Sequence, residues 1–136
     1  MAFPYTLAAF TIASGAAVSN QVFIGDGELV GIVMDASAWT TALITFLASA
    51  DGTNYYPIFD GTGTLVQVGG ASTLALAAAT YIAIGEEAHM SFAHFRGVQY
   101  LQLQSSSVAS NAPTAVNQGG ARVLTGVIRK TTTGTF

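Results

Sequence analysis

The chain has 136 residues, no cysteine and a formal net charge of −3 at pH 7, and only 8% of its residues are Asp, Glu, Lys or Arg. This length predicts one domain with a two-layer core, and the lack of cysteine excludes disulfide staples and thiolate metal sites. Ordinary soluble domains carry about 25% charged residues. We therefore expect copies of the chain or other partners to cover much of its surface. The alternative is a small soluble β domain with a polar, uncharged surface.

Nucleic acids and membranes are not expected partners. Binding a phosphate backbone needs clustered Lys and Arg, and the few basic residues near the C-terminus, Arg122, Arg129 and Lys130, make a thin patch. The longest nearly apolar run, residues 74–84, is too short for a membrane-spanning helix. The first residues lack the basic region of a signal peptide and include Pro4.

Residues 1–10 read as an apolar N-terminal arm, in which Pro4 favours an extended Phe3. Residues 5–13 also alternate well enough to form a strand. An edge strand and an arm that reaches over a neighbour both stay open.

Residues 18–24 predict a short strand, which ends at a turn with glycines at positions 25 and 27. Residues 28–35 are apolar or small on both faces, which predicts a central strand covered on both sides. The single tryptophan, Trp39, follows in a loop, where we expect it to close one end of the core rather than to stack on a ligand.

Residues 44–59 show the clearest pattern in the chain. Apolar and polar side chains alternate up to an Asp-Gly pair at 51–52, and a second apolar segment follows. Asp-Gly readily adopts the positive φ angles of tight hairpin turns, so the pattern predicts a β-hairpin. A second Asp-Gly pair at 60–61 leads into residues 64–68, which predicts a three-strand meander.

Helix and strand compete in residues 72–84, because alanine favours helix while the apolar side chains keep strict alternation. We assign residues 79–84 to a strand and leave the start open. Residues 86–97 predict a connection with one helical turn, since Phe92 and Phe95 are spaced to fold back into the core.

Residues 98–105 alternate as an amphipathic strand, and residues 121–131 predict the last one. Between them, residues 106–120 read as a long loop rich in Ser, Ala and Asn, a length typical of binding elements. Residues 131–136 form a short tail. These features predict a single all-β domain over residues 1–136, an antiparallel β-sandwich or jelly roll with at most one short helical turn.

The two histidines do not predict a metal site or a catalytic site. His89 and His94, with Glu86 or Glu87 as a third ligand, have a spacing that matches no hydrolase motif. Histidines that cap loops are the simpler interpretation.

The polar residues beside the turns also have simpler interpretations. Asp26, Asp51 and Asp60 each neighbour a glycine, so turn formation explains them better than calcium binding. Ser49, Asp51 and His94 are the residue types of a hydrolase triad but lack a nucleophile elbow. We expect no catalytic residue, cofactor or metal.

Four aromatic side chains could form a platform for sugar rings, namely Tyr55, Tyr56, Trp39 and Tyr100. Strand alternation would place about half of them in the core instead. A glycan is therefore kept as an alternative ligand.

Two stretches stand out, GELVGIVMDASAWTTALITFLASADGTNYYPIFDGTG at 27–63 and FRGVQYLQLQSSS at 95–107. They resemble a family of small structural proteins encoded in tailed-phage virion gene clusters. The order Ser49, Asp51, Gly52 and an aromatic is also similar to the discoidin-like, galactose-binding jelly roll, where it forms a hairpin turn and is not catalytic. Glutamines stand where the phage family has basic residues, so charged contacts are not carried over: Gln99, Gln102 and Gln104.

The resemblance covers about residues 27–129 and implies a non-enzymatic virion protein, assembled in the host cytoplasm. It suggests a decoration, or cement, protein that binds the major capsid protein or copies of itself on the outside of the head. The alternatives are a tail, neck or head-fibre subunit, or a carbohydrate-binding module for host adsorption. The arm, the long loop and the tail supply the candidate contact residues: Phe3, Pro4, Tyr5, Pro113, Asn117 and Phe136.

Overall fold

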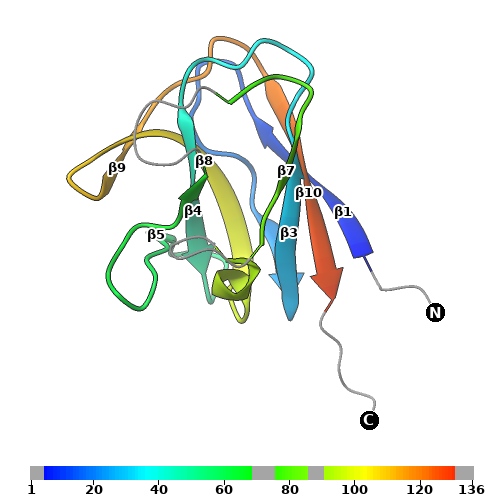
Figure 1. Ribbon diagram of the computed structural model, residues 1–136, viewed down its shortest axis with the longest axis vertical. Helices are drawn as coiled ribbons and strands as arrows, with labels where there is room; N and C mark the ends of the chain where they lie inside the picture. Colours follow the sequence, from blue (N-terminus) through cyan, green and yellow to red (C-terminus); the bar gives the residue numbers. More distant parts are fainter. Residues whose placement is uncertain (1–4, 69–75, 86–90, 131–136) are drawn as a thin grey trace.

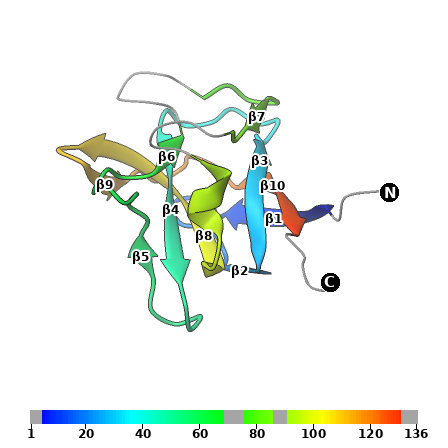
Figure 2. The same cartoon turned by 60° about the horizontal axis from the view of Figure 1, so that its bottom comes forward.

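The computed structural model describes residues 5–68, 76–85 and 91–130, which form two antiparallel sheets packed face to face (Figures 1 and 2). Sheet A has the strand order β1-β10-β3-β7, and sheet B has the order β2-β8-β4-β5, with β6 on β4 and β9 on β8. The predicted antiparallel β-sandwich is confirmed; its finer assignment as a jelly roll stays a prediction. The elements are β1 (Tyr5–Ile12), β2 (Val22–Gly25), β3 (Gly27–Val33), β4 (Leu43–Ser49), β5 (Tyr56–Pro57), β6 (Gln67–Val68), β7 (Tyr81–Ala83), the 3-10 helix η1 (Phe92–Phe95), β8 (Gln99–Ala109), β9 (Ala112–Ala115) and β10 (Arg122–Lys130).

The predicted hairpin is present, and the segment after the second Asp-Gly pair does turn back onto the second strand, with Phe59 bridged to Leu65, before β6 continues onto β4. β5 pairs with Leu47 and Ala48, and β6 pairs with Ile44 and Thr45. The other edge of β4 is taken by β8 along its whole length. The two short strands therefore share one edge of β4, which makes β4 an interior strand of sheet B.

β3 is the central strand that the sequence predicts, with β10 on one side and β7 on the other. The predicted faces are wrong, because Leu29 and Ile32 should lie on opposite sides and both are fully buried in the core. The β3–β10 register shifts so that Leu29 faces Ile128 while Gly31 faces Val127. Val30 is the extra residue of a β-bulge, which resets the alternation and turns both side chains inward.

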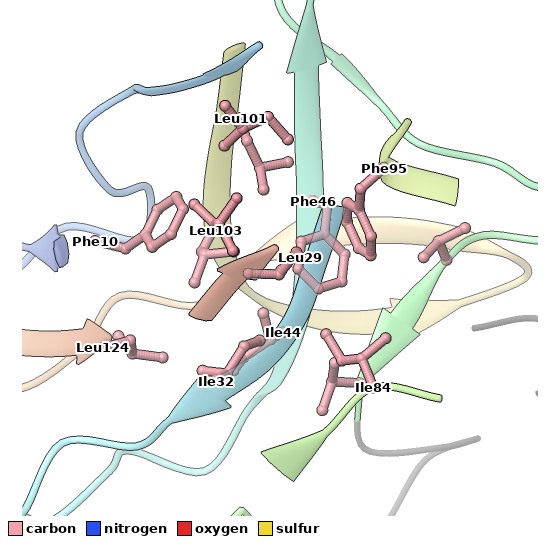
Figure 3. Close-up of a cluster of buried hydrophobic side chains, with 14 of the residues drawn as sticks. Phe10, Leu29, Ile32, Ile44, Phe46, Ile84, Phe95, Leu101, Leu103 and Leu124 are labelled. Carbon is pink, nitrogen blue, oxygen red and sulfur yellow. The ribbon is translucent and has the colours of Figure 1, made fainter. Parts of the chain in front are cut away.

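The core lies between the two sheets and draws side chains from both (Figure 3). Phe46 of sheet B meets Phe95 edge to face, with ring centroids 4.9 Å apart. Phe95 belongs to η1, which is the predicted helical turn, and Ser91 and His94 close its start as a capping box. The fully buried side chains shared by these layers are Phe10, Ile12, Ile24, Leu29, Ile32, Ile44, Phe46, Phe95, Leu101, Leu103 and Leu124.

Residues 106–120 and residues 1–10 both contribute strands to the sheets. The first were expected as a loop, and for the second an edge strand was one of the two possibilities left open. β8 runs on to Ala109 and β9 pairs back onto it. Ser110 and Asn111 have φ angles of 51° and 60°, which form a tight hairpin turn. Of the expected arm 1–10, Tyr5 onward belongs to β1, an edge strand paired with β10. Residues 1–4 and the tail 131–136 lie outside the described residues.

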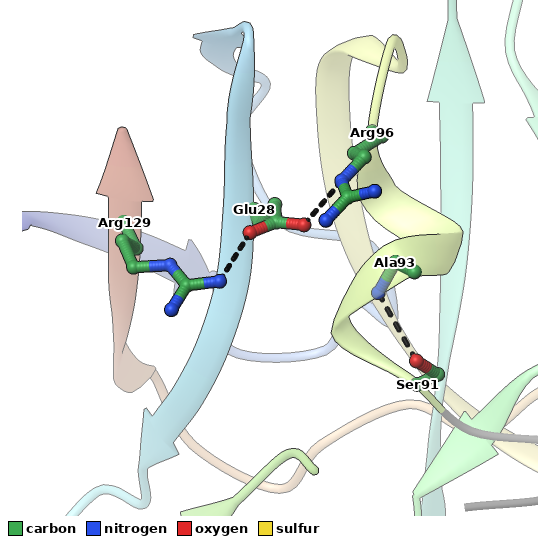
Figure 4. A network of polar contacts seen from close by, with 5 residues as sticks. All are labelled: Glu28, Ser91, Ala93, Arg96 and Arg129. Carbon is green, nitrogen blue, oxygen red and sulfur yellow. Dashed lines mark hydrogen bonds and ion pairs between the residues drawn. The ribbon is translucent and has the colours of Figure 1, made fainter. Parts of the chain in front are cut away.

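Glu28 is a fully buried carboxylate in β3 that joins three elements (Figure 4). One of its oxygens accepts from Arg96 Nε at 2.5 Å and the other from Arg129 Nη2 at 2.7 Å. The hydrogen bond to Glu28 raises the pKa of Arg129 above its ordinary value. Arg129 also lies over the Phe92 ring, 5.2 Å from its centroid. The network ties β3 to η1 and to β10.

Gln118 is a second buried polar side chain, and both its amide oxygen and its amide nitrogen have hydrogen-bond partners. Its Nε2 donates to the Thr40 carbonyl at 3.1 Å and to Ser105 Oγ at 2.8 Å. Its Oε1 accepts from the Thr40 N–H at 2.9 Å and from Arg122 Nε at 3.1 Å. One amide therefore joins the Trp39 loop, β8 and the start of β10.

Candidate interaction surface

The Ser49 hydroxyl is part of a turn and is not available as a nucleophile. It is 3% exposed, accepts from the N–H groups of Asp51 and Gly52 at 3.2 and 2.9 Å, and donates to Asp51 Oδ1 at 2.9 Å. His94 accepts from the Ser91 N–H at 3.2 Å within the η1 cap. Each candidate triad residue thus has a local structural role.

The Asp51 carboxylate closes its own hairpin turn. It accepts from the N–H groups of Thr53 and Asn54 and from the Asn54 side chain, each at 2.9 Å. These bonds, led by the one from the Asn54 backbone, hold the pKa of Asp51 far below its ordinary value of 3.8. Charge on Asp51 therefore stabilises the turn, which agrees with the turn interpretation of this Asp-Gly pair.

Asp60 binds its own loop in the same way. Its Oδ1 accepts from the Thr62 N–H, the Thr62 hydroxyl and the Thr64 N–H at 2.8, 2.6 and 3.0 Å. Within residues 5–68, 76–85 and 91–130, no three His, Cys, Asp or Glu side chains come together as metal ligands. Glu86, Glu87 and His89 of the candidate metal set lie outside the described residues.

The predicted aromatic platform is divided between two places. Tyr100 pairs with Ser49 at the end of β4, whereas Trp39 donates its Nε1–H to the Ala42 carbonyl beside the start of β4. Trp39 is half-buried and packs against the core, as expected. Tyr56 is exposed on the edge strand β5.

A different aromatic residue, Phe23, stands beside Tyr100. The rings are tilted by 59° with centroids 5.1 Å apart, and Phe23 is 60% exposed. Tyr55 lies close by and its hydroxyl is hydrogen-bonded to Gln21. Burial, with the nearby Tyr100 and Asp51, raises the pKa of Tyr55. The sequence pattern did not single out Phe23, because its short strand shows little alternation.

The outer face of sheet A, which we call the A face, is largely uncharged, and Arg129 at its border, opposite Tyr5, is paired with Glu28. Core-facing Phe10 and Leu124 set the alternation of β1 and β10, so the intervening side chains point away from the core. Leu7 is 69% exposed and Tyr81 is 59% exposed. The A face comprises Tyr5, Leu7, Ala9 and Thr11 of β1, Val123, Thr125 and Val127 of β10, Val33 of β3 and Tyr81 of β7.

The predicted contact residues fall on separate surfaces. Tyr5 lies on the A face, while Pro113 is in β9, on the hairpin that extends from sheet B. Figure 1 shows β9 on the side of the molecule away from β1. Asn117 is exposed between β9 and β10. The remaining candidates, Phe3, Pro4 and Phe136, lie outside the described residues.

Comparisons with protein-family models, curated proteins and solved structures found no match to this chain. Within the described ranges, the four-residue η1 is the only helix, and none is long and apolar enough to cross a membrane.

Proposed function

We propose that this chain is a non-enzymatic structural protein of a tailed-phage virion, a decoration protein that binds the outside of the head through the A face. The sequence resemblance supports the virion assignment. The A face is the structural observation that supports the binding role, because its exposed side chains are apolar or hydroxyl-bearing, and the charged Arg129 at its border, opposite Tyr5, is engaged with Glu28. Such a surface suits a permanent contact with a protein shell.

The physical gain on docking comes from apolar burial repeated over many copies. Full burial of a leucine side chain contributes about 1.5–3 kcal/mol, and Leu7 has 69% of its surface available for it. Tyr81 and Val123, 59% and 44% exposed, add to the same patch. Shell sites that are multiplied by symmetry can therefore retain a subunit whose single contact is modest.

The direct test is imaging of purified particles that carry the chain, with occupancy compared between two variants. Val123→Lys places a charge in the A face, and Tyr56→Lys places one at an exposed aromatic residue of sheet B. We expect the first to reduce occupancy on the head and the second to leave it unchanged. Full occupancy with Val123→Lys contradicts the A face as the docking surface. Density confined to the tail, neck or head fibres favours those alternatives instead.

A glycan-binding role in host adsorption is the second candidate, and the exposed Phe23 ring beside Tyr100 favours it. Aromatic faces of this kind bind sugar rings through their apolar sides. A glycan array that is positive for the purified chain and negative for Phe23→Ala would support this role. Tyr56→Ala serves as the control, because it removes an exposed aromatic residue of another strand. A uniformly negative array rules against the role.

A further inference from the structure

β1 is the outermost strand of sheet A and pairs with β10 alone (Figure 1). In an antiparallel ladder, alternate residues point their N–H and C=O groups away from the partner strand. Thr11 and Ala9 show which residues these are, because their outward groups bind Asn20. The Thr11 N–H donates to Asn20 Oδ1 at 2.7 Å, and Asn20 donates its N–H to Thr11 O and its Nδ2–H to Ala9 O, both at 3.3 Å.

The same alternation places the Leu7 N–H and C=O and the Ala9 N–H on the outer edge. No residue in the described ranges makes a hydrogen bond to these three groups. Asn20 therefore covers the second half of the β1 edge and leaves the Leu7 N–H and C=O and the Ala9 N–H open. An open row of backbone donors and acceptors selects an extended strand as its occupant.

We propose that this edge binds β1 of a second copy of the chain, antiparallel and centred on Leu7. In this register the two Leu7 residues exchange both N–H···O=C bonds across a two-fold axis. Their side chains meet on the A face, so apolar contacts accompany the backbone bonds. The two A faces join into one continuous surface.

The sequence of β1 favours self-pairing. Natural edge strands are protected by charged residues, proline or short length, whereas β1 is eight residues long with the uncharged sequence YTLAAFTI. The other end strands, β7, β5 and β2, have three, two and four residues. Two identical uncharged strands meet without charge repulsion, and Asn20 in each copy limits the pairing to the groups that it leaves open. The inference does not rest on the virion proposal, because it concerns the purified chain.

The test combines sedimentation analysis of the full chain with hydrogen–deuterium exchange. We expect a concentration-dependent dimer in which the Leu7 and Ala9 amides become protected as the dimer forms. Leu7→Pro removes the central donor, which the β1–β10 ladder does not use, and should raise the dimer dissociation constant by at least about tenfold. Val123→Lys, on the A face but away from the edge, should leave dimer formation intact.

A second variant distinguishes loss of the dimer from a folding defect in Leu7→Pro. Leu7→Lys keeps the backbone donor and places two like charges opposite each other, so it should also weaken the dimer. A chain that stays monomeric at all concentrations overturns the inference. So does a dimer whose Leu7 and Ala9 amides exchange freely, or one that Val123→Lys disrupts while Leu7→Pro does not. A heterologous strand from another protein that protects these amides, while the chain alone stays monomeric, also overturns it.

Discussion

Removing the carboxylate of Glu28 and removing its partner Arg129 should destabilise the fold by different amounts, because Glu28 is buried and its two partners are more exposed. Glu28 is fully buried, whereas the side chains of Arg96 and Arg129 are 60% and 33% exposed. Glu28→Gln leaves two arginines that water can solvate. Arg129→Met leaves a buried carboxylate with one partner. We expect Arg129→Met to destabilise the fold more than Glu28→Gln, although both remove the same contact.

The magnitude for Glu28→Gln follows from its hydrogen bonds. A bond to a charged group contributes about 1.5–3 kcal/mol, and glutamine keeps one of the two acceptor oxygens. Because the substitution also removes the cost of burying a carboxylate, we expect a net loss of about 1–2 kcal/mol in the free energy of unfolding. Leaving a buried charge without its partner costs about 3–5 kcal/mol in general. That larger cost applies to the carboxylate that Arg129→Met leaves behind.

Urea unfolding followed by the fluorescence of Trp39 measures these losses. Trp39 is the single tryptophan and is half-buried against the core, so its emission should change on unfolding. The double variant should lose less than the sum of the two single variants, because removing Glu28 makes the loss of Arg129 matter less. Equal losses in the two single variants, or additivity in the double, would refute this reasoning.

Three other substitutions test the packing and the turns. Gly126→Ala places a methyl group 2.6 Å from Phe10 Cε2 and should destabilise the fold by about 1–3 kcal/mol in urea unfolding. Asp51→Asn should destabilise it at pH 7. The lowered pKa of Asp51 contributes stability above its ordinary value of 3.8 and loses it as the pH falls toward the lower folded value, so the difference should shrink below pH 3.8. A difference that is constant down to pH 2 would contradict this. Gln118→Ala leaves both backbone groups of Thr40 without their partner and should cost about 1–3 kcal/mol.

Much of the fold follows from short-range patterns in the sequence. Alternation predicts the first part of β8, the run at 28–35 that is apolar on both faces predicts β3, the Asp-Gly pair at 51–52 predicts the hairpin, and the spacing of Phe92 and Phe95 predicts η1. The β-bulge at Val30 left no such signal, because both faces of β3 are apolar and either alternation fits. The β8–β9 hairpin was missed for a related reason, since its strands are made of small and polar residues that show no apolar period.

The A face and the open edge of β1 depend on contacts between distant residues. Alternation in β1 separates Leu7 and Ala9 from Phe10, but it does not say which set faces the core. That choice is made by pairing with β10, more than a hundred positions away for Tyr5 and Arg129. The role of Asn20 is equally invisible locally, because it depends on the chain folding back beside β1. Phe23 gains its neighbour Tyr100 from β8 in the same way.

The pairing of Tyr5 with Arg129 brings the start of β1 and the end of β10 together. A short linker across this point, with the chain opened at the exposed Ser110 and Asn111 turn, would give a circular permutant that begins at β9 and ends with β8. Every strand would keep its neighbours, because the cut removes no ladder bond. The new termini would leave from the β8–β9 hairpin of sheet B, so a fused domain would stand clear of the A face and of the β1 edge.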